Sequence, residues 1–315
     1  IVVAVSFLAL VLTCIGLTPY DKPENFEGIK KSSTPTMKEM FGLLKENKEL
    51  GRYIVAASSD KLAQTVGGQS VIATLLFSVL LGSMVGSSII SAIAMLPSII
   101  FAIIGARMSG KQGNKKVMVD WTWVCIILNV LYAVFLLFSD TTRITRALIP
   151  SVLFFLFTFG NNAVKMVVST ATNALRMDIV DYELYRSGRF MPASVSATYS
   201  FVDKLVSSLG ATIATGMVAL IGYNQVAPQA SDPLTTAVKV MTVVLLIGFP
   251  ILGWICTILA MKKSELSREK MVEVQRVNKE RQGQGVSEEY SKQVRDERYS
   301  ETLKETVEDT VTPGE

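Results

Sequence analysis

The sequence contains no histidine, and its three cysteines stand far apart. Without histidine, the chain can form neither a Ser-His-Asp triad nor a zinc site with imidazole ligands. Cys14, Cys125 and Cys256 each lie in an apolar stretch, and no Cys-x-x-Cys spacing occurs, so neither a zinc site nor a redox motif is indicated. With no pair of nucleophile and base in view, we expect no enzyme activity, no cofactor and no bound metal.

Charged residues are also scarce, since they make up 18% of the 315 residues while 50% are hydrophobic. This balance is too apolar for a soluble chain of such length. The apolar residues come in blocks, each about as long as a helix that crosses a bilayer core of ~30 Å. A soluble domain with buried helices would need polar faces on most helices, and few are visible. The composition therefore predicts an all-α integral membrane protein surrounded by lipid, with no nucleic acid as a partner.

The blocks divide the chain into four parts. Residues 1–18 are apolar from the start and are interpreted as the end of a membrane helix, so the chain is expected to be a fragment. Residues 19–50 form a polar linker with an amphipathic helix, which lies either on the membrane surface or in solvent. Residues 51–262 hold six apolar blocks, and residues 263–315 form a charged tail, expected to be helical near the membrane and then largely disordered. The blocks lie at about 52–76, 83–106, 117–139, 147–176, 195–222 and 236–261.

Lysine and arginine are unevenly distributed over the connecting loops. One set of loops, with the linker and the tail, is rich in both residues, whereas the opposite set carries only Arg143 and Arg146. The positive-inside rule places the basic set in the cytoplasm. We therefore expect a multi-pass protein of the plasma (inner) membrane, with the central linker and the C-terminus cytoplasmic. One leading helix, a linker and six spans have the shape of the C-terminal half of a twelve-helix transporter, in which each half is two inverted three-helix repeats.

A few charges lie inside the apolar blocks, where each costs ~2.5–3.5 kcal/mol on insertion scales. Asp60, Lys165 and Lys204 would lie at similar depth, roughly 12–15 Å from the inner edge of the membrane. Snorkelling lysines or structural pairs could account for them. We interpret the layer instead as a site for substrate and ion coupling. Its candidate residues are Asp60, Gln64, Asn161, Lys165, Tyr199, Asp203 and Lys204.

Asp203 and Lys204 are neighbours in the chain, so they point about 100° apart on a helix and do not pair with each other. We expect Lys204 to be the polar hub between the substrate and ion sites, neutralised by Asp60 or by a carboxylate of the absent half. We expect Asp203 to pair with Lys165.

Two basic loops carry recognisable motifs. The stretch GARMSGKQGNKK, residues 105–116, resembles the loop Gly-x-x-x-Asp-Arg-x-Gly-Arg-Lys of the major facilitator superfamily, with Ser109 where the acid stands. The stretch MDIVDYELYRSGRFMP, residues 177–192, and the helix after it resemble the glycoside–pentoside–hexuronide:cation symporter family, which includes the melibiose permeases. The matching residues are Asp181, Tyr182, Glu183, Arg186, Gly188, Arg189, Lys204, Gly222 and Tyr223.

This resemblance covers about residues 1–262 and is strongest over 178–223. It implies a secondary active transporter that moves a sugar, glycoside or hexuronide together with Na⁺ or H⁺. It also implies that Lys204 links the sugar and cation sites, and that the cation carboxylates lie mainly in an N-terminal half absent from this chain. The expected cytoplasmic gate and loop residues are Arg107, Lys111, Asp181, Glu183, Arg186 and Arg189.

Two other functions remain open. The chain could belong to a major facilitator that moves a non-sugar organic solute, and the lysines would suit an anion. It could also be a membrane sensor or scaffold that signals through its tail without transport. The tail, which shows no apolar surface to pack, is expected to be dispensable for transport.

Overall fold

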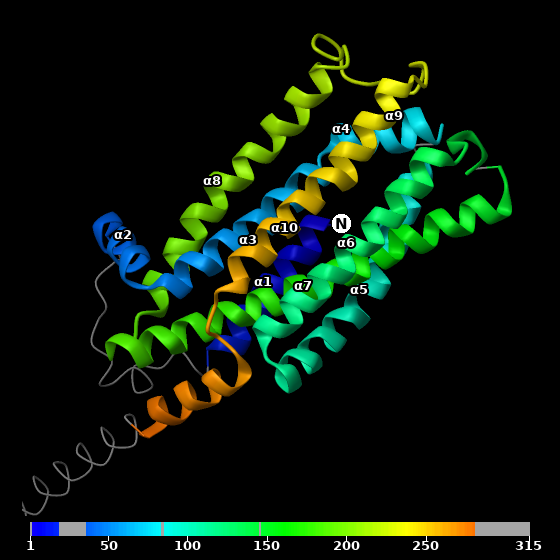
Figure 1. Ribbon diagram of the computed structural model, residues 1–315. Helices are drawn as coiled ribbons and strands as arrows, with labels where there is room; N and C mark the ends of the chain where they lie inside the picture. The colour runs from blue at the N-terminus through cyan, green and yellow to red at the C-terminus, as the bar shows by residue number, and fades with distance from the viewer. Residues whose placement is uncertain (1, 19–35, 83–84, 145, 281–315) are drawn as a thin grey trace, which may run out of the picture. The chain divides into compact units, whose positions relative to one another are not determined.

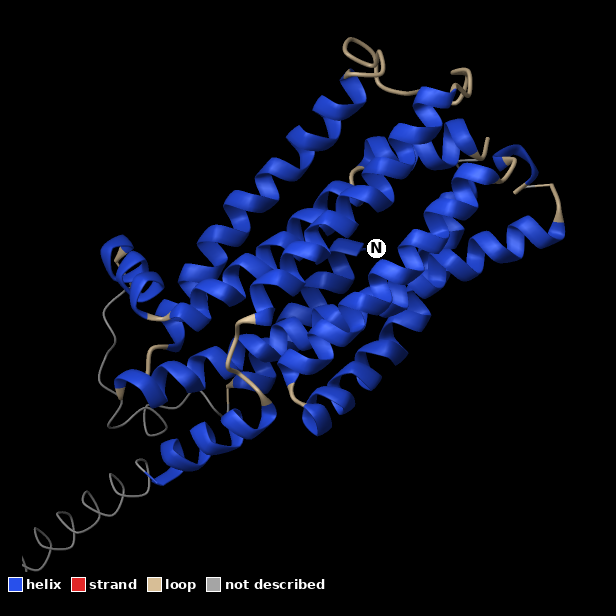
Figure 2. Ribbon diagram, viewed as in Figure 1, coloured by secondary structure: helices blue, strands red, loops and turns tan. Residues whose placement is uncertain are grey.

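A computed structural model describes residues 2–18, 36–82, 85–144 and 146–280, which are helical apart from turns and loops and contain no strand (Figures 1 and 2). The chain divides into two compact units, Ile1–Thr36 and Met37–Glu315. In the first unit, helix α1 (Val2–Leu17) is almost entirely apolar, and Phe7, Leu8 and Leu12 are exposed. A helix that is apolar all round needs lipid or another protein surface around it.

The second unit is a series of helices. Their bounds are α2 Met37–Glu46, α3 Lys48–Gly67, α4 Ser70–Ala73, α5 Val85–Gln112, α6 Asn114–Phe138, α7 Leu148–Ser187, α8 Pro192–Ala219, α9 Thr236–Val243 and α10 Phe249–Lys262. π-Helical turns extend α4 as η2 (Thr74–Leu80) and join α9 to α10 as η4 (Val244–Gly248). A 3₁₀ turn, η3 (Thr141–Arg143), lies between α6 and α7. Helix thus runs through each of the six apolar blocks.

Four helical segments of the described residues are long and apolar enough to cross a membrane, namely α6, α7, α8 and the run from α9 to α10. A fifth forms if α3 and the segment Ser70–Leu80, which are bent by 49° relative to each other, count as one broken span. Helix α5 contains Pro97 and is not among the four. The chain is therefore an all-helical membrane protein with four or five candidate spans, while six spans and a twelve-helix architecture remain predictions.

Helix α3 has a central place in the packing, because α10 and α8 both lie against it, while α5 and α6 pack on α7. Two glycines bring the α3 backbone close to its neighbours. A Cβ on Gly253 of α10 would lie 2.7 Å from the backbone oxygen of Ser59, and one on Gly210 of α8 would lie 2.6 Å from Cγ2 of Thr65. Membrane helices commonly approach each other through such small residues. Neither position has room for a larger side chain.

The buried apolar side chains form two clusters with a polar layer between them. On α3, Ala57 belongs to one cluster and Val66 to the other, and Asp60 lies between them. On α6, the buried Asn129 separates the two clusters in the same way. On both helices a buried polar side chain therefore lies between the two apolar clusters.

The segment after α10 corrects one expectation. Residues 268–280 are helical, and Leu266, Met271 and Val274 are buried in the apolar core. The Ser264 hydroxyl donates to the Glu49 carboxylate at 2.5 Å. The view that the residues after 263 have no apolar surface to pack is therefore wrong for 264–280, because Leu266 before the helix and Met271 and Val274 on it are buried. Residues 281–315 lie outside the described residues.

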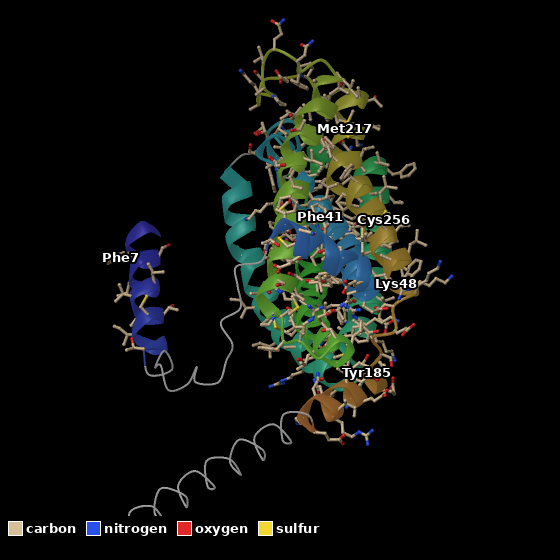
Figure 3. All side chains as sticks on the ribbon, turned by 90° about the vertical axis from the view of Figure 1, so that its left-hand side faces the viewer. Phe7, Phe41, Lys48, Tyr185, Met217 and Cys256 are labelled. Atoms are coloured by element: carbon tan, nitrogen blue, oxygen red, sulfur yellow. The ribbon has the colours of Figure 1, made fainter. Side chains whose placement is uncertain are left out.

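Helix α2 packs on the bundle through one edge. Met40 and Leu43 are buried, whereas Met37 and Phe41 are exposed. Figure 3 labels the Phe41 side chain on this helix. The helix contacts α3 and α8. It is therefore not free in solvent, and part of its apolar face is covered by protein. Most of the expected linker, residues 19–35, lies outside the described residues.

Candidate functional site

A cavity of about 390 Å³ lies beside the break between α3 and α4. Its wall comes from α3, the segment after the break, α6, α7 and η4. Six polar side chains line it, namely Gln64, Tyr132, Thr158, Asn161, Asn162 and Lys165. Gln64, Asn161 and Lys165 were predicted as site residues, so the structure brings three of the seven candidates to one cavity.

The break itself is a consequence of Gly67 and Gly68, since glycine is among the weakest helix formers. Helix α3 ends at Gly67, and the Gly68 amide donates to the Gln64 carbonyl at 2.9 Å. The Gln69 side chain donates to the Thr65 carbonyl, also at 2.9 Å. The Gly68 bond is an ordinary helical bond, and the Gln69 side chain satisfies the Thr65 carbonyl at the helix end. Both glycines line the cavity.

Asp60 is buried next to the cavity and is held by two donors. Its carboxylate accepts from Nε2 of Gln64 at 2.7 Å and from the indole Nε1 of Trp254 at 2.8 Å. Gln64 is one helical turn further along α3 and also lines the cavity. A ligand that engages the Gln64 amide therefore acts on a group that is bonded to the buried charge.

Lys165 reaches the same tryptophan from α7. Its ammonium lies 5.5 Å from the centroid of the Trp254 ring, within the range of a cation–π contact. Among the described residues no carboxylate lies within 4.0 Å of this ammonium. The expected ion pair between Lys165 and Asp203 is therefore not formed, and the amine of Lys165 is accessible to a ligand in the cavity.

Asn129 supports the cavity wall from α6. Its Nδ2 donates to Oδ1 of Asn161 and to the Cys125 carbonyl, both at 2.9 Å. Sequence reasoning singled out neither Asn129 nor Trp254. The signal for Asn129 was present, since a lone amide in the middle of an apolar block is costly unless it is hydrogen-bonded.

Tyr199 and Asp203 form a second cluster, apart from those cavity residues. The Tyr199 hydroxyl donates to Oδ1 of Asp203 at 3.4 Å. The Tyr199 ring lies 5.5 Å from the Tyr53 ring and 5.5 Å from Cζ of Arg176. Tyr53 and Arg176 are therefore added to this part of the site, and the single layer expected from the sequence becomes two clusters.

Lys204 stands apart from both clusters. It is exposed on α8, as are Ser200 and Ser208, each four residues away. The Asp60 carboxylate accepts from Gln64 and Trp254, and no ion pair joins it to Lys204. The expected Lys204–Asp60 pair is thus absent, and the polar stripe of α8 forms a face that the described residues leave open.

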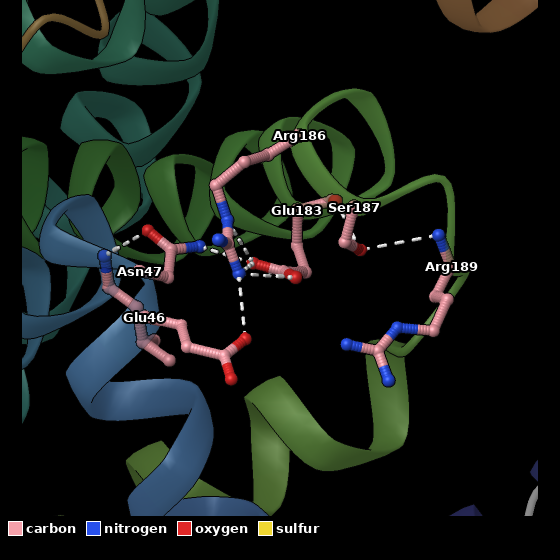
Figure 4. A network of polar contacts seen from close by, with 7 residues as sticks. Glu46, Asn47, Glu183, Arg186, Ser187 and Arg189 are labelled. Carbon is pink, nitrogen blue, oxygen red and sulfur yellow. Dashed lines mark hydrogen bonds and ion pairs between the residues drawn. The ribbon is translucent and has the colours of Figure 1, made fainter.

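At the end of the bundle that holds the turns at Gly113 and Gly188, which we call the inner end, Glu183 centres a polar network (Figure 4). Its fully buried carboxylate accepts from Nδ2 of Asn47 at 2.7 Å and from Arg186 at 3.0 Å. Arg186 also lies 3.6 Å from the Glu46 carboxylate. Asn47 caps α3 by accepting from the Leu50 amide. The network therefore ties α2 and α3 to the end of α7.

The other predicted gate residues are less engaged. The Asp181 carbonyl accepts from Asn278 at 2.9 Å. The Arg189 amide donates to the Ser187 hydroxyl just after Gly188, whose φ of +69° ends α7. Arg107 and Lys111 are exposed near the end of α5. Of the six predicted residues, the structure joins Glu183 and Arg186 directly, and it does not bring Arg107 or Lys111 into their network.

Within the described residues, no group of three or more His, Cys, Asp or Glu side chains could hold a metal ion. A family model described as MFS/sugar transport protein matches residues 1–263. A search of curated proteins found no match.

Proposed function

The chain belongs to the MFS/sugar transport protein family, and on that premise we propose that it serves the symport of a sugar, glycoside or hexuronide with Na⁺ or H⁺. A member of this family is an integral, multi-pass membrane transporter rather than an enzyme. The cation coupling, the melibiose-permease-like character and the plasma-membrane orientation with a cytoplasmic linker and tail are parts of the proposal.

The observation that carries the proposal is the cavity beside the α3 break. Its volume of about 390 Å³ suits a small solute. The polar wall offers amides and hydroxyls, which both donate and accept hydrogen bonds, as sugar hydroxyls do. The rest of the wall is apolar, with Leu76 and Phe77 among its residues. This mixture fits a sugar ring, which presents hydroxyls at its edge and C–H groups on its faces.

Lys165 favours an acidic sugar within this class. Its ammonium lines the cavity and has no carboxylate within 4.0 Å among the described residues. A uronate carboxylate would neutralise it. The same lysine would suit a non-sugar organic anion, which is the second candidate substrate.

The coupling ion is proposed to act through charges that flank the cavity. Asp60 is linked to the cavity through Gln64, so a cation or proton at Asp60 changes what the Gln64 amide offers a ligand. Lys204 is proposed to face the aqueous transport path, because an exposed lysine at mid-membrane depth is costly against lipid. Occupancy of one site would then bias the other.

Counterflow tests the proposal. The full-length protein is reconstituted in vesicles loaded with unlabelled solute, and entry of a labelled glucuronide, a neutral galactoside and a non-sugar carboxylate is measured with and without a Na⁺ or H⁺ gradient. We expect exchange of the glucuronide, stimulated by a cation. Exchange of only the non-sugar acid would support the second candidate, and binding without any exchange would support a sensor or scaffold.

The variant Lys165→Gln and the control Lys61→Gln separate the cavity from general charge effects. Lys61 is exposed on α3 and does not line the cavity. We expect Lys165→Gln to lose exchange of the glucuronide by roughly tenfold or more, because the variant lacks the ammonium that would bind the glucuronide carboxylate. Lys61→Gln should exchange like the parent. Equal loss in both would remove the cavity from the mechanism.

A further inference from the structure

A second hollow, of about 320 Å³, lies at the inner end of the bundle. The turn between α5 and α6, the end of α10 and the start of the helix of residues 268–280 form its walls. Four of its side chains are cationic, namely Lys115, Lys116, Lys262 and Arg268. Asp120 and Glu269 also line it. Four positive and two negative side chains leave the hollow with a surplus of two positive charges.

None of the four cations forms an ion pair within the described part of the chain. No carboxylate there lies within 4.0 Å of any of the four. Lys115 donates to the Ser264 carbonyl, while Lys116, Lys262 and Arg268 are exposed. Because the four cationic side chains outnumber the two carboxylates around the hollow, an anion bound among them would be stabilised.

The walls of the hollow are preformed. Gly113 takes a φ of +91° in the turn between α5 and α6. A Cβ there would lie 3.0 Å from Cβ of Arg268, so the turn sits directly against the start of the helix of residues 268–280. This contact fixes Lys115 and Lys116 on one side and Arg268 on the other. A binding site that exists before its ligand arrives costs less ordering free energy on binding.

The apolar surface of the bundle ends at this hollow. Trp123 and Val124 are exposed on α6 just after the lining residue Asp120, and Leu259 is exposed on α10 just before Lys262. Exposed tryptophan on a membrane helix is typical of the level of the lipid headgroups. The hollow therefore lies where the hydrocarbon-facing surface gives way to the polar one.

We propose that this hollow binds the phosphate group of an anionic phospholipid. Lys116, Lys262 and Arg268 surround the phosphate, Lys115 closes the site, and the acyl chains run along the exposed apolar side chains of α6 and α10. Basic pockets between membrane helices bind such headgroups in this manner. The site is separate from the cavity beside the α3 break, since the two share no lining residue.

Native mass spectrometry of the purified full-length protein tests this site without requiring transport. Phosphatidylglycerol and phosphatidylcholine are offered at equal concentration, and the fraction of protein that retains each lipid is measured. A Lys or Arg beside an anionic headgroup contributes roughly fivefold in affinity. The triple variant Lys116→Gln, Lys262→Gln and Arg268→Gln should therefore lose phosphatidylglycerol by on the order of a hundredfold.

The matched control removes the same charge nearby. The triple variant Lys263→Gln, Arg276→Gln and Lys279→Gln changes exposed residues that do not line the hollow, and it should retain the lipid like the parent. Equal retention in both triple variants would overturn the proposal. So would equal retention of phosphatidylcholine and phosphatidylglycerol by the parent.

Two measurements on the parent protein need no variant. Raising the salt concentration should reduce retention of phosphatidylglycerol, because salt screens exposed charges, and a salt-independent retention would contradict the site. Excess inorganic phosphate should displace little lipid, because it has no acyl chains to contact α6 and α10. Complete displacement would show that a free phosphate, and no lipid, is the ligand.

Discussion

The Asp60 carboxylate depends on hydrogen bonds for its place in the structure, because no lysine or arginine of the described residues comes within 4.0 Å of it. Trp254 supplies one of its two donors and carries Lys165 over its ring. A single aromatic side chain therefore positions both charges beside the cavity. Its own burial is complete, so the indole cannot shift without disturbing both α3 and α7.

Replacing Trp254 with Phe removes the N–H and keeps most of the ring. We expect the variant to be less stable by about 1–3 kcal/mol, the cost of leaving a buried acceptor short of a donor. The midpoint of thermal unfolding in detergent measures the loss. Trp123→Phe is the control, because Trp123 is exposed. An unchanged midpoint for Trp254→Phe would show that Gln64 alone holds Asp60.

Lys204 allows the opposite test, in which function changes and stability does not. The side chain is exposed and has no ion-pair partner within the described residues. We expect Lys204→Ala to unfold at the same temperature as the parent and to lose cation-stimulated accumulation of the solute. Uptake normalised to protein in the membrane is the measurement. If the variant accumulates solute like the parent, Lys204 does not line the transport path.

At the scale of the elements, the helix of residues 268–280 acts as a strap over the inner end. Its buried Met271 and Val274 enter the apolar core, and Lys270 lies 4.9 Å over the Tyr185 ring of α7. Asn278 adds the bond to the Asp181 carbonyl. The strap therefore contributes to the stability of the helix ends that it contacts.

Truncation after Ser267 is consequently expected to destabilise the protein, whereas the prediction that the tail is dispensable for transport stays a prediction about uptake. Fully burying a Met or Val side chain contributes about 1.5–3 kcal/mol, and the truncation exposes the core that both side chains cover. A lower unfolding midpoint is the expected result. Truncation after Glu280, which keeps the strap, is the control. A neutral outcome for both truncations would mean that the strap only rests on the bundle.

The close packing of α10 on α3 leads to a second prediction at this scale. A Cβ at Gly253 meets backbone at 2.7 Å, whereas a Cβ at Gly216 meets nothing within 4 Å. Gly253→Ala should therefore push α10 away from α3 and lower the unfolding midpoint, by about 1–3 kcal/mol of stability. Gly216→Ala should be neutral or slightly stabilising, because alanine is the better helix former. The same sign for both variants would contradict close packing at Gly253.

For the whole molecule, the sequence predicted where the helices lie better than which side chains become neighbours. Apolar runs mark helices because lipid and core both select apolar side chains. Which helices lie side by side depends on packing that no single run contains. Lys165 therefore meets Trp254 of α10 rather than Asp203, and Lys204 meets no acid within the described residues.

The strap shows that the average composition of a segment does not predict whether the segment packs. The many charges of this segment predicted that it would not pack. The structure nevertheless buries Leu266, Met271 and Val274 in the apolar core. Local spacing of a few apolar residues outweighs the average over a long tail. The gate network is an intermediate case, because its motif pointed to Glu183 and Arg186, whereas Asn47, which completes it, stands in a linker with no motif.

The membrane orientation rests on loop charges and is open to direct measurement. Cysteines introduced at Lys45 and Ser231, both exposed, should react with an impermeant thiol reagent from opposite sides of the membrane. The basic loops predict Lys45 on the cytoplasmic side and Ser231 outside. A variant without the three natural cysteines provides the background. Reaction of both positions from one side would break the predicted topology.

Helix α7 is long enough to carry a movement from the cavity to the inner end of the bundle. The helix runs for 40 residues without interruption, and Lys165 in the cavity wall stands roughly 27 Å along it from Glu183 at the inner end. A tilt of about five degrees at the cavity would then swing the far end by about 2 Å. That displacement would be enough to pull the 2.7 Å bond between Asn47 and Glu183 apart. A solute bound by Lys165 would in this way separate Asn47 from Glu183 at the inner end of the bundle.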